Sequence, residues 1–143
     1  MARKVNLWGW LKGRLFRPAG DWRKGKTEVY PAKDGWRLRI KAGNGEIVGH
    51  GTRAYKDKAL AVDIARGLRR HAFGFAVRDV PSPYEVIGEF VYRKAKDGFR
   101  FRLYFHQEQV VQGEAYTAEA GVLNGCMAVK NALDSGILYV QKA

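Results

Sequence analysis

Residues Lys33–Ile40 read KDGWRLRI, and residues Lys96–Leu103 read KDGFRFRL. In both stretches an Asp-Gly pair, which is typical of a tight turn, precedes apolar residues that alternate with arginines, the pattern of a half-buried strand. The two stretches lie about sixty residues apart. A pattern that returns in this way indicates one supersecondary unit present twice, so any fold must account for both copies.

The match between the copies extends beyond this strand. A second short apolar run, Ile47-Val48 or Val110-Val111, follows in each copy, and then a tyrosine, Tyr55 or Tyr116, leads into a helix-like stretch. Each unit therefore reads β-β-α or β-β-β-α. We predict an α+β fold of two tandem β-β-(β)-α repeats with pseudo-twofold symmetry, in which antiparallel sheets are each backed by one helix.

The second copy resembles the YegP-like domain, a small bacterial domain of unknown function that commonly occurs as tandem pairs. The resemblance rests on the strand Phe99–Leu103, the run Val110-Val111, the tyrosine Tyr116 and the helix Asn124–Ala132. The first copy keeps the family's Asn-Gly turn within residues 42–46. The resemblance covers roughly residues 29–72 and 89–132. It implies a tandem fold, and it implies no activity.

Length and composition bound the class of protein. The chain has 143 residues, of which 46% are hydrophobic, enough for one core shared by two packed repeats. No stretch approaches the roughly 20 apolar residues of a membrane span, and the basic N-terminus lacks the apolar run of a signal peptide. We therefore expect a cytoplasmic protein. The single cysteine, Cys126, is expected to be a buried apolar side chain.

Three segments follow from these patterns: a basic aromatic arm at residues 1–26, a first repeat at 27–79 and a second repeat at 80–143. Two prolines within residues 79–83 stiffen the connection between the repeats. Alternating apolar residues at Phe73, Phe75 and Val77 predict a further edge strand that pairs with the other repeat or with a second chain. Because two repeats can pair each other's edges, we expect a monomer, with a homodimer as the alternative.

The net charge of +12 is unevenly distributed along the chain. Residues 1–26 carry eight lysines and arginines against one acidic residue, residues 27–79 carry eleven against six, and residues 80–143 carry seven against seven. A one-sided basic field attracts polyanions such as nucleic acid, an anionic membrane or an acidic protein. Ordinary solubility is the alternative explanation.

The arm combines basic residues with tryptophan, leucine and phenylalanine. Its apolar residues could dock on the body of the protein. A free arm of this composition could instead enter a DNA groove or lie at a membrane interface.

The alternation within the strands predicts which face each side chain occupies. Trp36, Leu38 and Ile40 should face the core, and Arg37, Arg39 and Lys41 the opposite side. The second copy should likewise place Arg100 and Arg102 outward. The first helix should contribute the core residues Leu60, Ile64 and Leu68, supported by Ala61 and Ala65. The second helix should contribute Val122, Met127 and Val129. Helices on one face would leave the arginine face of the sheet free.

A three-stranded sheet backed by one helix and displaying arginines is also the layout of the plant ethylene-response DNA-binding domain and of the arm-binding domains of tyrosine integrases. By this analogy we expect a non-enzymatic protein that binds double-stranded DNA through the arm and the first repeat. The expected contact residues are Arg3, Lys4, Lys12, Arg14, Arg17, Arg37, Arg39, Lys41 and Arg53. Two alternatives remain: a module that binds an acidic protein or inhibits a host factor, and a solvated face whose arginines pair with acids such as Asp34, Glu46, Asp97 and Glu114.

Catalytic motifs are not apparent in the sequence. The three histidines, His50, His71 and His106, show no metal-ligand spacing with one another or with Cys126. A Gly-x-Ser-x-Gly elbow is not found. We expect no enzymatic activity, no catalytic residue, no metal and no cofactor.

Overall fold

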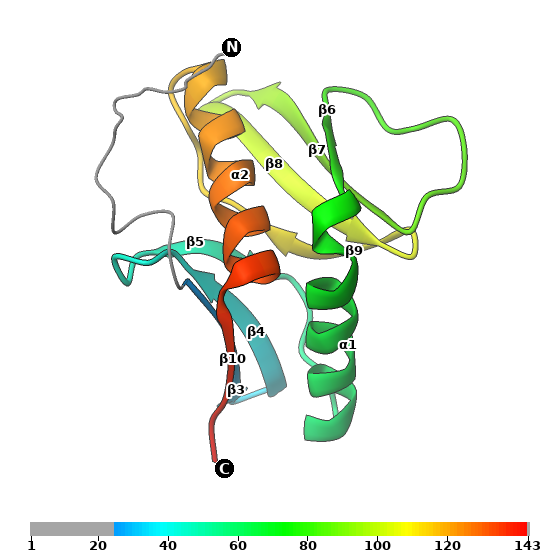
Figure 1. Ribbon diagram of the computed structural model, residues 1–143. Coiled ribbons are helices and arrows are strands. Elements are labelled where there is room, and N and C mark those ends of the chain that lie inside the picture. The colour runs from blue at the N-terminus through cyan, green and yellow to red at the C-terminus, as the bar shows by residue number, and fades with distance from the viewer. Residues whose placement is uncertain (1–24, 143) are drawn as a thin grey trace.

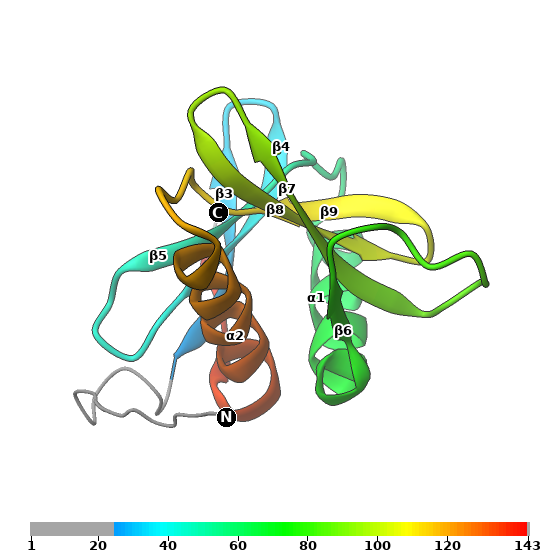
Figure 2. The same cartoon turned by 90° about the horizontal axis from the view of Figure 1, so that it is seen from above.

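Within residues 25–142, which the computed structural model describes, eight strands form one sheet, and two α-helices pack side by side against one of its faces (Figure 1). The sheet curves over the helices, and its other face carries no helix (Figure 2). The strands are β3 (Lys26–Ala32), β4 (Gly35–Lys41), β5 (Ile47–Gly51), β6 (Ala76–Arg78), β7 (Gly88–Ala95), β8 (Gly98–Phe105), β9 (Glu108–Gln112) and β10 (Ile137–Val140). The helices are α1 (Lys58–His71) and α2 (Glu119–Ser135), and the short 3-10 helix η2 (Ala72–Gly74) follows α1.

The strand order across the sheet is β10-β3-β4-β5-β9-β8-β7-β6. Antiparallel pairs join β3 to β4, β4 to β5, β7 to β8 and β8 to β9, and an antiparallel pair between β5 and β9 joins the two halves at the centre. Parallel pairs stand at the two edges, β10 with β3 and β6 with β7. The fold is therefore of the α+β class, and each half lends its last strand to the other half.

Antiparallel sheets, each backed by one helix, were expected; the described residues instead form one mixed sheet over both helices. Each short sheet would have left unpaired edges, which proteins pair or cover. The strand expected around Phe73–Val77 does form at the sheet edge, as β6, and it pairs with the other half at β7. The first strand within the described residues, β3, begins at Lys26, one residue before the boundary expected at residue 27.

The two Asp-Gly turns of the duplicated stretch need glycine for the same geometric reasons. Gly35 and Gly98 adopt φ values of 134° and 123°, a region that side chains with a Cβ rarely enter. A Cβ at either glycine would also overlap a main-chain oxygen, that of Tyr55 or that of Tyr116. The next residue along, Trp36 or Phe99, forms an isolated antiparallel bridge with the same tyrosine.

The core lies between the sheet and the helices. As the alternation predicted, Leu38, Ile40, Phe101 and Leu103 are buried on the helix side. Helix α2 contributes Val122, Val129 and Leu133, all fully buried. Cys126 is also buried among these residues, as expected.

Two of the expected core residues lie at the surface instead. Leu60 is 46% exposed and Met127 is 44% exposed. On α1 the buried positions are Ala61, Ala65 and Leu68. Because two of these three residues are alanines, the backbone of α1 packs close to the sheet, with few large side chains between them.

One side chain of each helix donates hydrogen bonds to the end of the other helix or to the segment that follows it. Arg69 on α1 donates to the main-chain oxygens of Gly136 at 2.9 Å and Leu133 at 3.4 Å. Lys130 on α2 donates to the main-chain oxygen of Phe75 at 3.0 Å. The helices are therefore tied together by polar contacts as well as by the core.

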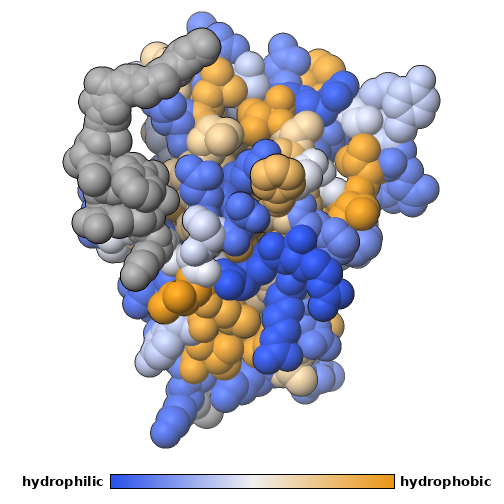
Figure 3. All heavy atoms as spheres, viewed as in Figure 1, coloured by the Kyte–Doolittle hydropathy of each residue, from blue (hydrophilic) through white to orange (hydrophobic). Residues whose placement is uncertain are grey.

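On the helix side, hydrophilic and hydrophobic residues alternate over the surface (Figure 3). Among the described residues, no helix has both the length and the apolar character that a membrane crossing requires.

Candidate nucleic-acid interface

The helix-free face of the sheet brings together the outward side chains of both halves. The strand register aligns one line of residues across all eight described strands. From β10 to β6 this line consists of Tyr139, Glu28, Arg39, His50, Gln112, Arg102, Val91 and Arg78. Arg37 and Lys41 flank Arg39 on the same face, and Arg100 flanks Arg102, as the alternation predicted.

In the first half, one buried carboxylate holds three of the basic side chains. Glu28 is only 3% exposed. Its oxygens lie 2.5 Å from Arg39 Nε, 3.3 Å from Lys41 Nζ and 3.4 Å from Lys26 Nζ. Burial alone would raise the pKa of Glu28, but the hydrogen bonds and charges of Arg39 and Lys41 outweigh it and hold this pKa below its usual value. The ring of Tyr30 also packs against Arg39, whose guanidinium carbon lies 4.2 Å from the ring centre.

The other two expected contact residues of this half also have carboxylate partners. Arg37 contacts Asp34 at 2.6 Å, and Arg53 contacts Glu108 at 2.8 Å. Asp34 had been considered as a partner, but Glu28 had not, because its position opposite Arg39 depends on strand register. The remaining expected residues, Arg3, Lys4, Lys12, Arg14 and Arg17, lie outside the described residues.

In the second half, fewer arginines of the same face are paired with a carboxylate than in the first half. Arg93 lies directly opposite Arg100 across β7 and β8. Arg100 is paired with Asp97 at 2.6 Å, whereas Arg93 and Arg102 are exposed and have no ion pair with any residue between 25 and 142. These side chains surround a hollow of about 360 Å³, which we call the β7–β8 hollow. It is lined by Val91, Arg93, Lys94, Ala95, Arg100, Arg102 and Tyr104.

Sequence reasoning missed Arg93 because no pattern in the duplicated stretch points to it. The signal that could have found it is the continued alternation of the strand after Tyr92, which places Arg93 on the face opposite Phe90.

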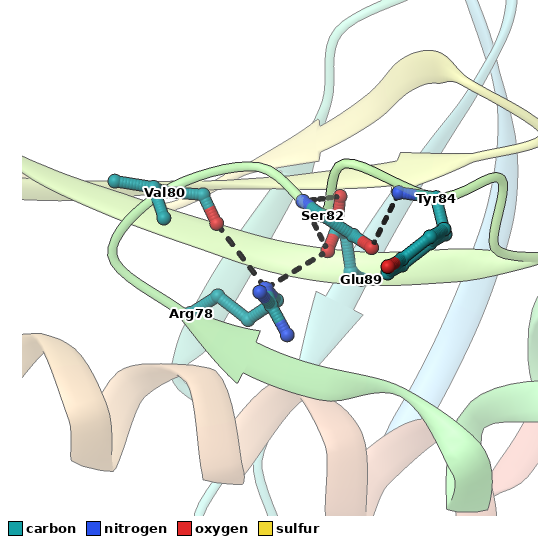
Figure 4. Close-up of polar contacts among 5 residues, drawn as sticks. All are labelled: Arg78, Val80, Ser82, Tyr84 and Glu89. Carbon is teal, nitrogen blue, oxygen red and sulfur yellow. Dashed lines mark hydrogen bonds and ion pairs between the residues drawn. The ribbon is translucent and has the colours of Figure 1, made fainter.

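A further acid on this face, Glu89, is occupied by local contacts (Figure 4). The main-chain N–H of Ser82 donates to Glu89 Oε1 at 3.3 Å and to Oε2 at 3.2 Å, and Arg78 Nε lies 3.7 Å from Oε1. Arg78 also donates to the main-chain oxygen of Val80 at 3.3 Å, and the N–H of Tyr84 donates to Ser82 Oγ at 3.1 Å. Glu89 therefore anchors the loop at residues 79–87 and does not neutralise Arg93 or Arg102.

The described residues offer little reactive chemistry. Between residues 25 and 142, no group of three or more histidine, cysteine or acidic side chains is arranged to hold a metal ion. Burial raises the pKa of the Cys126 thiol to about 12, so this thiol stays protonated at neutral pH. His50 lies 3.6 Å from Glu114 on the helix-free face.

In a comparison with known proteins, residues 32–79 match a family described as a domain of unknown function, DUF1508. Among curated proteins, none matches the chain. The protein of unknown function YegP from E. coli, solved by solution NMR, is 22% identical, with a TM-score of 0.64 over 83% of this chain and 94% of that one.

A second NMR structure, of a UPF0339 protein from Shewanella oneidensis, is 20% identical, with a TM-score of 0.62 over 82% of this chain and 91% of that one. At these identities the likeness concerns the fold alone. The family match and the two structural likenesses together support a YegP-like domain in this chain.

Proposed function

We propose that this protein binds double-stranded DNA without catalysing a reaction, through the helix-free face of its sheet together with the basic arm. The observation that carries the proposal is the alignment of arginines from both halves on one face of one sheet. A β-sheet fits the width of the major groove, and arginines contact both phosphates and guanine edges.

We also infer that residues 27–79 and 80–143 are copies of one unit, related by pseudo-twofold symmetry. Arg69 and Lys130 support this inference, because each reaches the segment that follows the other helix. The two donors are separated along the chain by the same number of residues as their acceptors, Phe75 and Gly136. In this arrangement β5 of the first half pairs with β9 of the second half within one chain, so we expect a monomer. We also expect a cytoplasmic location.

An acidic protein is the second candidate partner. Exposed apolar side chains on the loop at residues 79–87 favour it, namely Val80, Tyr84, Val86 and Ile87. Such side chains are more typical of protein interfaces than of DNA interfaces.

Fluorescence anisotropy with a labelled duplex of mixed sequence tests the proposal. The full chain is titrated at several KCl concentrations. We expect micromolar or tighter binding at low salt, and a log–log slope of about −0.9 for each phosphate contact. The variant R66Q/R70Q is the matched control, because both arginines are exposed on α1, on the helix side.

Absence of a complex at micromolar protein and low salt would overturn DNA binding. A saturable complex with a purified acidic protein that survives nuclease treatment, without duplex binding, would favour the second candidate.

A further inference from the structure

The β7–β8 hollow brings like charges together in a way that needs an explanation. Arg93 and Arg100 are direct cross-strand neighbours, and Arg102 lies two residues further along the same face. Like charges directly opposite each other on antiparallel strands destabilise a sheet. A protein that keeps three guanidinium groups here gains stability when an anion lies between them.

The acids near this hollow do not supply that anion. Asp97 contacts Arg100 alone. Glu89 is held by Ser82 and Arg78, and Glu114 lies beside His50. Within residues 25–142, Arg93 and Arg102 therefore remain without a carboxylate partner.

The first half shows how the same arrangement looks when the protein provides the anion itself. On β3 and β4, Glu28 lies opposite Arg39 and Tyr30 opposite Arg37. On β7 and β8, Val91 lies opposite Arg102 and Arg93 opposite Arg100. The second half thus has an apolar residue where the first has a buried carboxylate, and an added arginine where the first has a tyrosine. An external anion can take the place that Glu28 fills.

The chemistry of the hollow selects an oxyanion. Guanidinium groups offer paired N–H donors that match phosphate oxygens and bind them at two points. The volume of about 360 Å³ exceeds that of a single phosphate and accommodates a diphosphate. Tyr104 adds a hydroxyl to the lining.

We propose that the β7–β8 hollow is a phosphate-binding site in which Arg93, Arg100 and Arg102 hold one or two adjacent phosphate groups. The proposal rests on the proposed function in that a DNA backbone phosphate is one source of the ligand. A free diphosphate is the other source, and it allows the site to be tested without DNA.

Thermal unfolding of the full chain with added sodium pyrophosphate tests the site directly. At matched ionic strength set with NaCl, we expect Tm to rise with the logarithm of the pyrophosphate concentration, by about 9 °C near 100 times the dissociation constant. R93Q/R102Q should lose this rise, and R66Q/R70Q should keep it. An unchanged wild-type Tm, or an equal rise in R93Q/R102Q, would overturn the proposal.

The variant V91E gives a second test that does not depend on removing arginines. A glutamate at this position would supply the carboxylate that Glu28 supplies in the first half. We expect V91E to unfold at a higher temperature than the wild type without pyrophosphate, and to lose the response to it. A full pyrophosphate response in V91E contradicts a site between these arginines.

Duplex titrations separate this proposal from the proposed function. A pyrophosphate response without duplex binding leaves the phosphate site in place and removes DNA as its source. Duplex binding by the wild type and by R93Q/R102Q with equal affinity, without any pyrophosphate response, removes the site and leaves DNA binding in place.

Discussion

Arg69 on α1 donates a hydrogen bond of 2.9 Å to the main-chain oxygen of Gly136, the C-cap residue directly after helix α2. The last carbonyls of a helix lack partners within it, and a positive charge there also complements the helix dipole. One side chain of the first half therefore completes a helix of the second half. Lys130 makes the corresponding contact in the other direction, to Phe75.

Removing the Arg69 contact should destabilise the whole fold. We expect R69Q to lower the free energy of unfolding by about 2 kcal/mol, because partly buried carbonyls lose a charged donor. Urea unfolding followed by circular dichroism measures this. R66Q, on the exposed side of the same helix, should change it by less than about 0.5 kcal/mol.

The two halves should not fold separately. An isolated fragment of residues 80–143 loses β6 beside β7, β5 beside β9 and β3 beside β10. We expect this fragment to show no cooperative unfolding transition, while the full chain elutes at a light-scattering mass near 16.1 kDa. A fragment that folds cooperatively as a monomer would contradict this prediction.

Glu28 should make stability depend on acid pH. Its pKa is lowered in the folded state, so its contribution is fully present above the usual value of 4.5 and is lost as pH falls through the lower folded-state value. We expect E28Q to be less stable than the wild type at pH 7, because three basic side chains lose their carboxylate. The difference should shrink as the pH is lowered from 4.5 through the folded-state pKa of Glu28. E85Q, in the exposed loop, serves as the control and should match the wild type throughout.

Substitutions in the turn between β8 and β9 should stabilise the protein. His106 and Gln107 both adopt positive φ, 50° and 68°, where asparagine and glycine are favoured. We expect H106N/Q107G to raise the free energy of unfolding by about 0.5–1 kcal/mol. G98A provides the contrast, because a methyl group there would overlap the main-chain oxygen of Tyr116, and it should destabilise the protein.

The arginines without a carboxylate partner should contribute more to the affinity for DNA than the arginines that have one. The charge distribution along the chain favoured the first repeat, but Arg37 and Arg53 there are already paired with carboxylates. We therefore expect R93Q/R102Q to weaken duplex binding about tenfold and R37Q/R53Q distinctly less. A larger loss in R37Q/R53Q would instead support the charge distribution as the guide, and equal losses would contradict both.

The sequence alone determined the local hairpins and the faces of their strands. The Asp-Gly turns need a residue without a Cβ at Gly35 and Gly98, and strand side chains alternate with a period of two. Both constraints act within a few residues, so they placed Leu38 and Phe101 inward and Arg39 and Arg102 outward, as the structure has them. The position of Leu60 escaped this reasoning, because helix periodicity does not say which side of an apolar stripe meets the sheet.

Only the tertiary structure decided that the hairpins join into one sheet, and which charges on its free face remain unpaired. The pairs β5–β9, β10–β3 and β6–β7 connect strands from different halves of the chain, and they depend on how the halves pack. The same long-range register puts Glu28 opposite Arg39 and Val91 opposite Arg102. Charge counted along a chain adds these residues without regard to distance, whereas the Coulomb energy depends on which side chains lie within a few ångströms of each other.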